Sequence, residues 1–137
     1  MEGKILLDIV TPERSVIKEE VLEVTAPGEE GEFGVLPGHT PFITTLKAGE
    51  VKYRKNGTPG YLAVNRGFAE VTANKVYLLV ESAESAEQID LKRAEAARAR
   101  AEDRIKLAGK DEEIDFTRAQ AALTRALVRI QVASRAR

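Results

Sequence analysis

Hydrophobic residues follow two different patterns along this chain, and the change falls near residue 84. Up to that point they form short runs, several of which alternate with polar residues, as in Val21-Leu22-Glu23-Val24 and Val51-Lys52-Tyr53-Arg54. Alternation with a period of two is typical of half-buried strands. Between the runs lie turn-forming pairs, of which Asn56-Gly57 is the sharpest, because a type I′ hairpin requires positive φ at both central residues. The runs predicted to be strands are 5–10, 21–26, 42–46, 51–53, 61–64, 68–71 and 76–80.

Seven or more short strands at this spacing predict a compact β-sandwich or flattened barrel. All 5 prolines and all 3 tyrosines of the chain fall within this part. From residue 85 onward the composition changes to Ala, Arg, Glu, Leu and Gln, which favour helix. The sequence therefore predicts an α+β protein with a β-sandwich domain over residues 1–84 and a helical domain over residues 85–137.

The helical part contains one segment twice. Residues 89–105 and 114–130 are identical at 10 of 17 positions. Each copy opens with an Ile-Asp pair, and Asp90 and Asp115 can accept hydrogen bonds from the first-turn N–H groups of a helix. Gly109 is well placed to end the first helix. We therefore predict two helices of roughly 17–22 residues, joined around residues 110–113 into an antiparallel hairpin.

The predicted contact between the two helices is rich in alanine. Alanine lets backbones approach closely but removes little apolar area from water, at ~25 cal/mol per Å². We expect a weakly held hairpin that can detach from its sandwich or straighten. The two facing stripes are Ala94, Ala97, Ala101, Ile105 and Ala108 on the first helix, and Ala119, Ala122, Leu123, Ala126, Leu127 and Ile130 on the second.

Composition excludes several classes of protein. The chain has 137 residues and a net charge of −1, without the global basicity that non-specific nucleic-acid binding uses. It has no cysteine and one histidine, which excludes disulfides, thiol catalysis and His-rich metal sites. Neither a membrane span nor the architecture of a cleavable signal is found. We expect a soluble, intracellular protein with no direct membrane insertion and, since no nucleophile is paired with a base, no catalytic activity of its own.

One motif indicates the family. The stretch Gly31-Glu32-Phe33-Gly34-Val35-Leu36-Pro37-Gly38-His39-Thr40-Pro41 closely resembles the GE(L/F)G(I/V)LPGH-P motif of the epsilon subunit of bacterial F-type ATP synthase. Segments 7–12, 67–71, 89–94 (IDxxRA) and 114–116 agree with the family in the same order. The resemblance therefore covers essentially the whole chain. It departs at Arg66, where the family commonly has glycine, and this affects the packing of that turn.

The resemblance implies a ten-stranded β-sandwich followed by a helical hairpin, in a non-catalytic subunit of the central rotor stalk. The implied partners are the gamma subunit, the ring of c subunits and the catalytic alpha and beta subunits. The implied place is peripheral, on the cytoplasmic face of the bacterial cell membrane. Such a subunit couples proton translocation to ATP synthesis, and in many members its C-terminal helices inhibit ATP hydrolysis.

The first candidate site is the segment 29–39, which we expect to be a loop. It places Glu29, Glu30 and Glu32 among glycines, beside the rigid turn that precedes His39. By composition alone it is a solvated acidic turn. The resemblance instead implies a contact with the c ring and gamma subunit, in which Glu32 and His39 occupy the contact positions.

The second candidate site is a pair of arginine stripes. Arginines at spacing i, i+7, i+11 fall along one face of a helix. The first helix carries intervening acids and is well explained as a solubilising face. The second helix has no acid after its start, so an acidic partner is expected, and by resemblance this is the acidic loop of the beta subunits. The stripes are Arg93, Arg100 and Arg104, and Arg118, Arg125 and Arg129.

The third candidate site is a regulatory ATP site, again implied by the resemblance. Guanidinium groups bind phosphate oxygens bidentately, and an Asp at a helix start can accept a hydrogen bond from the adenine amine. No glycine-rich phosphate loop accompanies them, so the site would sense ATP without hydrolysing it. A structural alternative makes Asp90 an N-cap and pairs Arg93 with Glu84 or Glu87. The matching residues are Glu84, Ile89, Asp90, Arg93, Ala94, Arg100, Arg125 and Arg129.

No cofactor or metal is required by this reading of the sequence, and ATP is expected only as a regulatory ligand. A rival interpretation is a free-standing ATP-binding regulatory module that works outside the complex. Co-purification with the alpha, beta and gamma subunits separates the two.

Overall fold

The computed structural model describes residues 3–108, 110 and 114–136. The chain divides into two compact units, Met1–Ser85 and Ala86–Arg137. The first unit is built from ten strands, so the predicted α+β class with about ten strands is confirmed. They are β1 (Ile5–Val10), β2 (Ser15–Val21), β3 (Glu23–Gly28), β4 (Gly31–Val35), β5 (Phe42–Leu46), β6 (Gly49–Lys55), β7 (Thr58–Val64), β8 (Gly67–Val71), β9 (Lys75–Val80) and β10 (Ala83–Ser85).

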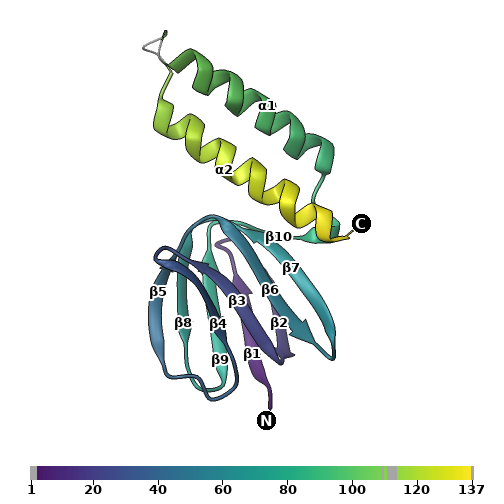
Figure 1. The fold of residues 1–137 in the computed structure, drawn as a ribbon. Coiled ribbons are helices and arrows are strands. Elements are labelled where there is room, and N and C mark those ends of the chain that lie inside the picture. Colours follow the sequence, from purple (N-terminus) through teal and green to yellow (C-terminus); the bar gives the residue numbers. More distant parts are fainter. Residues whose placement is uncertain (1–2, 109, 111–113, 137) are drawn as a thin grey trace. The chain divides into compact units, whose positions relative to one another are not determined.

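The ten strands form one continuous sheet that bends back on itself (Figure 1). Its order is β10-β7-β6-β3-β5-β8-β9-β1-β2, with β4 paired to β3. All described pairings are antiparallel except β1 with β9. Between β2 and β3 the chain turns a corner at Leu22, whose N–H donates to the carbonyl of Arg54 on β6 over 2.8 Å. This bond extends the pairing of β3 with β6, in which Glu23 lies opposite Arg54.

The core of the first unit is formed by every second side chain of its strands. Ile5, Leu7 and Ile9 on β1 are completely buried, and Leu78 on the neighbouring β9 is as well. Their neighbours in sequence point to the other side of the sheet, because successive side chains of a strand alternate. The same alternation in β3, β6, β8 and β9 supplies the rest of the core.

The predicted hairpin at Asn56-Gly57 is confirmed. Both residues have positive φ, 51° and 80°, and Lys55 pairs directly with Thr58. A type I′ turn is the expected result, since its twist matches that of the flanking strands.

Three strands lie outside the predicted runs. The polar strand β2, SVIKEEV, has few apolar residues because it is the last strand of the sheet order. Strand β4, GEFGV, is rich in glycine, and β10 has only three residues. The predicted strand 21–26 is also divided, because the corner at Leu22 falls within it.

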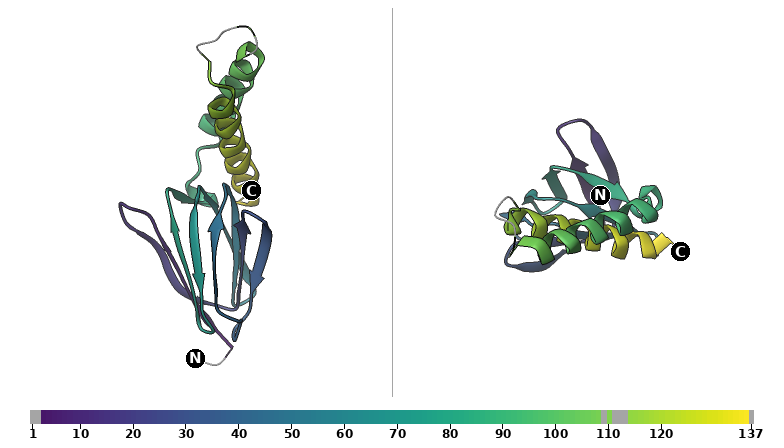
Figure 2. Two further views of the ribbon diagram at one scale, coloured as in Figure 1. Left: turned by 90° about the vertical axis from the view of Figure 1, so that its left-hand side faces the viewer. Right: turned by 90° about the horizontal axis from the view of Figure 1, so that it is seen from above.

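The second unit is a helical hairpin, as predicted. Helices α1 (Leu91–Ala108) and α2 (Phe116–Ala133) have 18 residues each, and Figures 1 and 2 show them alongside each other and running in opposite directions. The short 3-10 helices η1 (Ala86–Gln88) and η2 (Ser134–Ala136) complete the described part, and η1 lies against α2 and η2. The predicted helix terminator, Gly109, lies outside the described residues, as does most of the linker.

Alanines dominate the contact between the helices. Ala94 and Ala101 of α1 and Ala119 and Ala126 of α2 are buried. The placement of Leu127 in this contact was wrong, because its side chain is 46% exposed. It follows the buried Ala126 by one residue, which turns it about 100° away from the contact.

The close approach of β8 to β9 at Gly67 gives a stability prediction. A Cβ at Gly67 would lie 1.9 Å from the carbonyl oxygen of Leu79, whereas one at Gly34 would meet nothing nearer than 4.0 Å. Gly67→Ala should therefore lower the free energy of unfolding of the β-rich unit by about 2 kcal/mol or more. Urea unfolding followed by tyrosine fluorescence measures this, since Tyr53, Tyr61 and Tyr77 all lie in its strands.

Gly34→Ala is the matched control, because it adds the same methyl group to an unobstructed strand position. If the two variants unfold at the same urea concentration, the tight contact at Gly67 does not limit stability.

Candidate functional site

The repeated segment forms two helix starts of the same geometry. The backbone N–H of Arg93 donates to Oδ1 of Asp90 over 3.1 Å, and that of Arg118 donates to Oδ1 of Asp115 over 3.1 Å. The following residues, Ala94 and Ala119, donate to the carbonyl oxygens of the same aspartates. Both aspartates are therefore N-caps, as their sequence context predicted, and the repeat is a repeat of structure as well as of sequence.

The arginine stripes have a fixed relation to the buried alanines. Arg93 and Arg100 each stand one residue before a buried alanine of α1, and Arg118 and Arg125 each stand one residue before a buried alanine of α2. Each arginine is thus turned about 100° from the helix contact, in the same sense on both helices. Two antiparallel helices are related by a twofold axis perpendicular to the plane that contains both helix axes. Rotation about that axis keeps each face of the pair on its own side. Equal angular offsets from the helix contact therefore place both arginine stripes on the same face of the hairpin.

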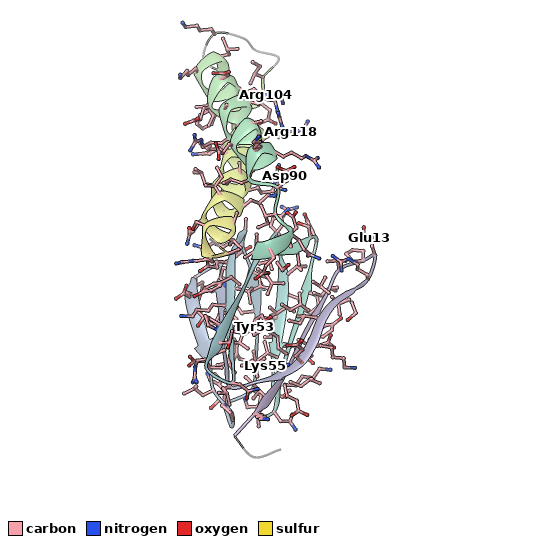
Figure 3. The ribbon with its side chains drawn as sticks, turned by 90° about the vertical axis from the view of Figure 1, so that its right-hand side faces the viewer. Glu13, Tyr53, Lys55, Asp90, Arg104 and Arg118 are labelled. Atoms are coloured by element: carbon pink, nitrogen blue, oxygen red, sulfur yellow. The ribbon has the colours of Figure 1, made fainter. Side chains whose placement is uncertain are left out.

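We call this surface the arginine face. Its members are Arg93, Arg100, Arg104, Arg118, Arg125 and Arg129. All are exposed except Arg129, which is half-buried. Figure 3 marks Asp90, at the start of α1, together with Arg104 and Arg118.

The opposite face of the hairpin has a different chemistry. Glu95 and Glu102 each follow a buried alanine of α1 by one residue, so they point away from the arginine face. Arg98 lies on their side of α1, with its Nε 3.7 Å from Oε1 of Glu102. Helix α2 contains no carboxylate at all. Positive charge therefore collects on one face of the hairpin, where α1 places Asp103 next to Arg104 and α2 has no acid at all.

Seven of the eight residues of the candidate ATP site belong to the helical unit. The exposed arginines among them can contact a ligand directly, and the half-buried Arg129 makes a further contact within the protein. Asp90 uses Oδ1 for its cap, so Oδ2 is the oxygen that can accept from an adenine amine. Ile89 and Ala94 are buried, which makes them packing residues in this conformation. The eighth residue, Glu84, lies on β10 opposite Ala63 of β7.

The segment 29–39 is not the single loop that was expected. Glu29 and Glu30 form the turn of the β3–β4 hairpin, in which Gly28 pairs with Gly31. Strand β4 then separates them from His39, because Phe33 and Val35 pair with β3, where Val35 is buried and Phe33 is partly buried. Glu32 therefore lies near one end of β4, and His39 follows its other end.

His39 is held in a tight turn. Its backbone N–H donates to Leu36, and Gly38 between them has a φ of 84° and donates to Ala73 in the β8–β9 turn. The His39 ring packs on Phe42 at 5.2 Å between centroids, with Nδ1 2.7 Å from the carbonyl oxygen of Thr40. Glu32 and His39 thus occupy firm positions, but they are two separate features.

Exposed apolar side chains form a candidate contact surface that the sequence reading missed. Leu36, Ile43 and Phe68 are 58%, 71% and 40% exposed. Ile43 on β5 and Phe68 on β8 lie on adjacent, directly paired strands. The exposure of Ile43 could have been predicted from the alternation of side chains along β5. Leu46 points inward, so Ile43, three residues earlier, points outward.

A shallow pocket of ≈ 450 Å³ borders Phe68. Its rim carries an ion pair in which Nη2 of Arg66 lies 2.9 Å from Oε1 of Glu81. The side chain of Arg66, the residue that departs from the family motif, is thus accommodated at the surface by Glu81, which directly follows β9. The other lining residues are Pro12, Glu29, Thr45, Leu46, Gly67, Leu79 and Val80.

The part of the chain that the structure describes has neither a membrane-spanning helix nor a cluster of metal-binding side chains. No helix in that part is long and apolar enough to cross a membrane. In the same part of the chain, no three His, Cys, Asp or Glu side chains are grouped so that they could hold a metal ion.

Comparisons with known proteins agree over nearly the whole chain. Residues 4–86 match the family described as ATP synthase, Delta/Epsilon chain, beta-sandwich domain, and residues 87–134 match its long alpha-helix domain. Similar relatives include the ATP synthase epsilon chain of Geotalea uraniireducens (strain Rf4), 53% identical over 106 residues and 77% of each chain. ATP synthase epsilon chain 2 of Syntrophotalea carbinolica is 54% identical over the same length and coverage.

Solved structures share the fold. A chain in the Euglena gracilis mitochondrial ATP synthase, from a structure of OSCP, F1 and c-ring, superposes with a TM-score of 0.83 at 23% identity, over 98% of this chain and 83% of that one. A chain from the central stalk and c-ring of the Tetrahymena thermophila enzyme gives 0.59 at 12% identity, over 97% and 96%. With both family domains matched in order, this chain belongs to the delta/epsilon chain family of ATP synthase and, within it, to the bacterial epsilon chains.

Proposed function

We propose that the chain is a non-catalytic rotor subunit that couples proton translocation to ATP synthesis and restrains ATP hydrolysis through its helices. The observation that carries this proposal is the unbroken family match from residue 4 to residue 134. On this proposal its partners are the gamma subunit, the c-subunit ring and the alpha and beta subunits. Its place is peripheral, on the cytoplasmic face of the bacterial cell membrane.

The β-rich unit is proposed to bind the stalk. Exposed Leu36, Ile43 and Phe68 supply apolar area, which is costly on a free surface but stabilising in an interface. Glu32 and His39 supply polar contacts toward the c ring and gamma subunit. The firm hold on His39, through Phe42 and the turn at Gly38, supports a role in positioning.

Ile43→Ser tests the stalk contact. Burying a large side chain at an interface centre is worth about 2 kcal/mol or more, so this variant should bind about 30-fold less tightly to a complex depleted of the native subunit. Lys18→Ser, on the exposed side of β2, is the control and should bind as the parent does. Equal affinity of both variants would remove Ile43 from the interface.

The helical hairpin is proposed to inhibit hydrolysis by presenting its arginines to the acidic loop of the beta subunits. Arg118, Arg125 and Arg129 lie on a helix without any carboxylate, so an acidic partner offsets their mutual repulsion. The alanine-rich contact between the helices supports a hairpin that can separate, because it buries little apolar area.

Deleting residues 87–137 should leave assembly and coupling largely intact and raise the ATP hydrolysis rate of the isolated complex. The physical reason is that the basic helix, which is proposed to block rotation, is gone, while the β-rich unit is retained. Steady-state ATPase assays on purified complexes measure the change. An unchanged rate in the truncated complex would show that the hairpin is not inhibitory here.

The folded hairpin is also proposed to sense ATP. Arg93, Arg100 and Arg125 are exposed on one face of the hairpin, and Asp90 lies at the start of α1 with one carboxylate oxygen directed to its cap. A triphosphate bound there would hold both helices together through charge-assisted hydrogen bonds. Occupancy would favour the folded hairpin over the extended, inhibitory one.

Arg125→Ala should weaken ATP binding to the isolated subunit by about tenfold or more, since a hydrogen bond to a charged group contributes about 1.5–3 kcal/mol. Arg129→Ala should have an effect in the same direction. Titration calorimetry measures both, with Lys92→Ala as a control that removes one exposed positive charge away from the arginine face. Absence of binding by the parent at millimolar ATP would dismiss the sensor.

A further inference from the structure

We propose that the hairpin carries a second polyphosphate-binding cluster at its linker end, formed by Arg104 and Arg118 together with Arg100 and Arg125. The proposed ATP site shares Arg100 and Arg125 with this cluster but adds Arg93 and Arg129 at the opposite end, so Arg104 and Arg118 are the residues that go beyond it. The ligand class is an inorganic chain of linked phosphates.

The internal repeat generates this cluster. The shift of 25 residues that relates the two copies makes Arg118 the counterpart of Arg93, and Arg129 the counterpart of Arg104. Because the two helices are antiparallel, Arg104 and Arg118 lie at one end of the hairpin and Arg93 and Arg129 at the other. Both copies have the same cap geometry and the same buried alanines, so the symmetry holds in the structure as well. The arrangement of arginines at one end of the hairpin is therefore reproduced at the other.

The positions of the four arginines along their helices place them in one region of the hairpin. Arg104 lies four residues before the end of α1, and Arg118 lies two residues after the start of α2. Arg100 and Arg125 are near the middle of their helices, close to the twofold axis. At 1.5 Å per residue the four arginines spread over roughly 10 Å along one face. Long, flexible arginine side chains can converge over that length on a single row of phosphates.

The charges at this end favour phosphate over other anions. Among the described residues, none of the four arginines forms an ion pair with a carboxylate. Guanidinium groups match phosphate oxygens bidentately and stay charged at any physiological pH. Exposed Asp103 directly precedes Arg104, and exposed Asp115 stands three residues before Arg118, so a ligand must carry denser negative charge than a single carboxylate. In the folded hairpin this favours linked phosphates over a single carboxylate.

Because the sites at both ends of the hairpin use Arg100 and Arg125, ligands at the two ends compete for these side chains. One polyphosphate that engages both central arginines leaves fewer donors for a second. Ligands at the two ends should therefore weaken each other, although each of them alone clamps α1 to α2.

Titration calorimetry of the full chain with inorganic tripolyphosphate, at constant low ionic strength, tests the cluster. The double variant Arg93→Ala/Arg129→Ala removes the opposite end and should still bind tripolyphosphate. Adding Arg104→Ala/Arg118→Ala should then lower the affinity by about tenfold or more. Adding Lys92→Ala/Lys106→Ala instead removes the same charge from other sides of α1 and should change the affinity by less than about threefold.

The proposal is overturned if the Arg93→Ala/Arg129→Ala variant binds no tripolyphosphate, or if both added pairs weaken binding equally. Circular dichroism at 222 nm on every variant verifies that the hairpin is folded. ATP titration of the parent separates this cluster from the ATP sensor. A parent that fails to bind ATP, with tripolyphosphate binding that still depends on Arg104 and Arg118, would dismiss the sensor and retain the cluster.

Discussion

The close packing of two alanine-lined helices is the contact on which the candidate site depends. Ala94 and Ala101 face the partner helix, and Ala119 and Ala126 face back. Because the alanines recur at the same positions in both copies, the arginine that precedes each of them is turned to the same side. Separation of the helices would leave two narrow basic stripes in place of one broad basic face. On the functions proposed above, the state of this contact would decide whether the hairpin presents a site for phosphates or a basic arm for an acidic protein surface.

The β-rich unit has a different physical basis. Its core follows from strict alternation and from one sheet that bends back on itself, so it needs no contribution from the helices. Its exposed apolar residues, Ile43 and Phe68, are consequences of strand register and cannot be turned inward without moving the core residues of the same strands outward.

Features that depend on interactions between residues close in sequence, namely one hairpin turn and the two helix starts, were predictable from the sequence. Asn56-Gly57 determines its turn through backbone conformation alone, and Asp90 and Asp115 determine helix starts through bonds to residues three positions away. Features that depend on distant strands were not predictable in the same way. The segment 29–39 looked like a loop until β3 was seen to pair with β4, and exposure of Ile43 depends on its register with β8. Leu127 was misplaced because a stripe of apolar residues does not fix the exact direction of a helix contact.

The central claim is that this chain works as a stalk subunit within an ATP synthase. Affinity purification of the tagged chain from membranes of its own bacterium, followed by mass spectrometry and an ATPase assay, tests it most directly. The account predicts that alpha, beta, gamma and c subunits co-purify with the chain in an assembly that hydrolyses ATP. Recovery of the chain as a monomer, with these subunits left in an intact complex elsewhere, would contradict it.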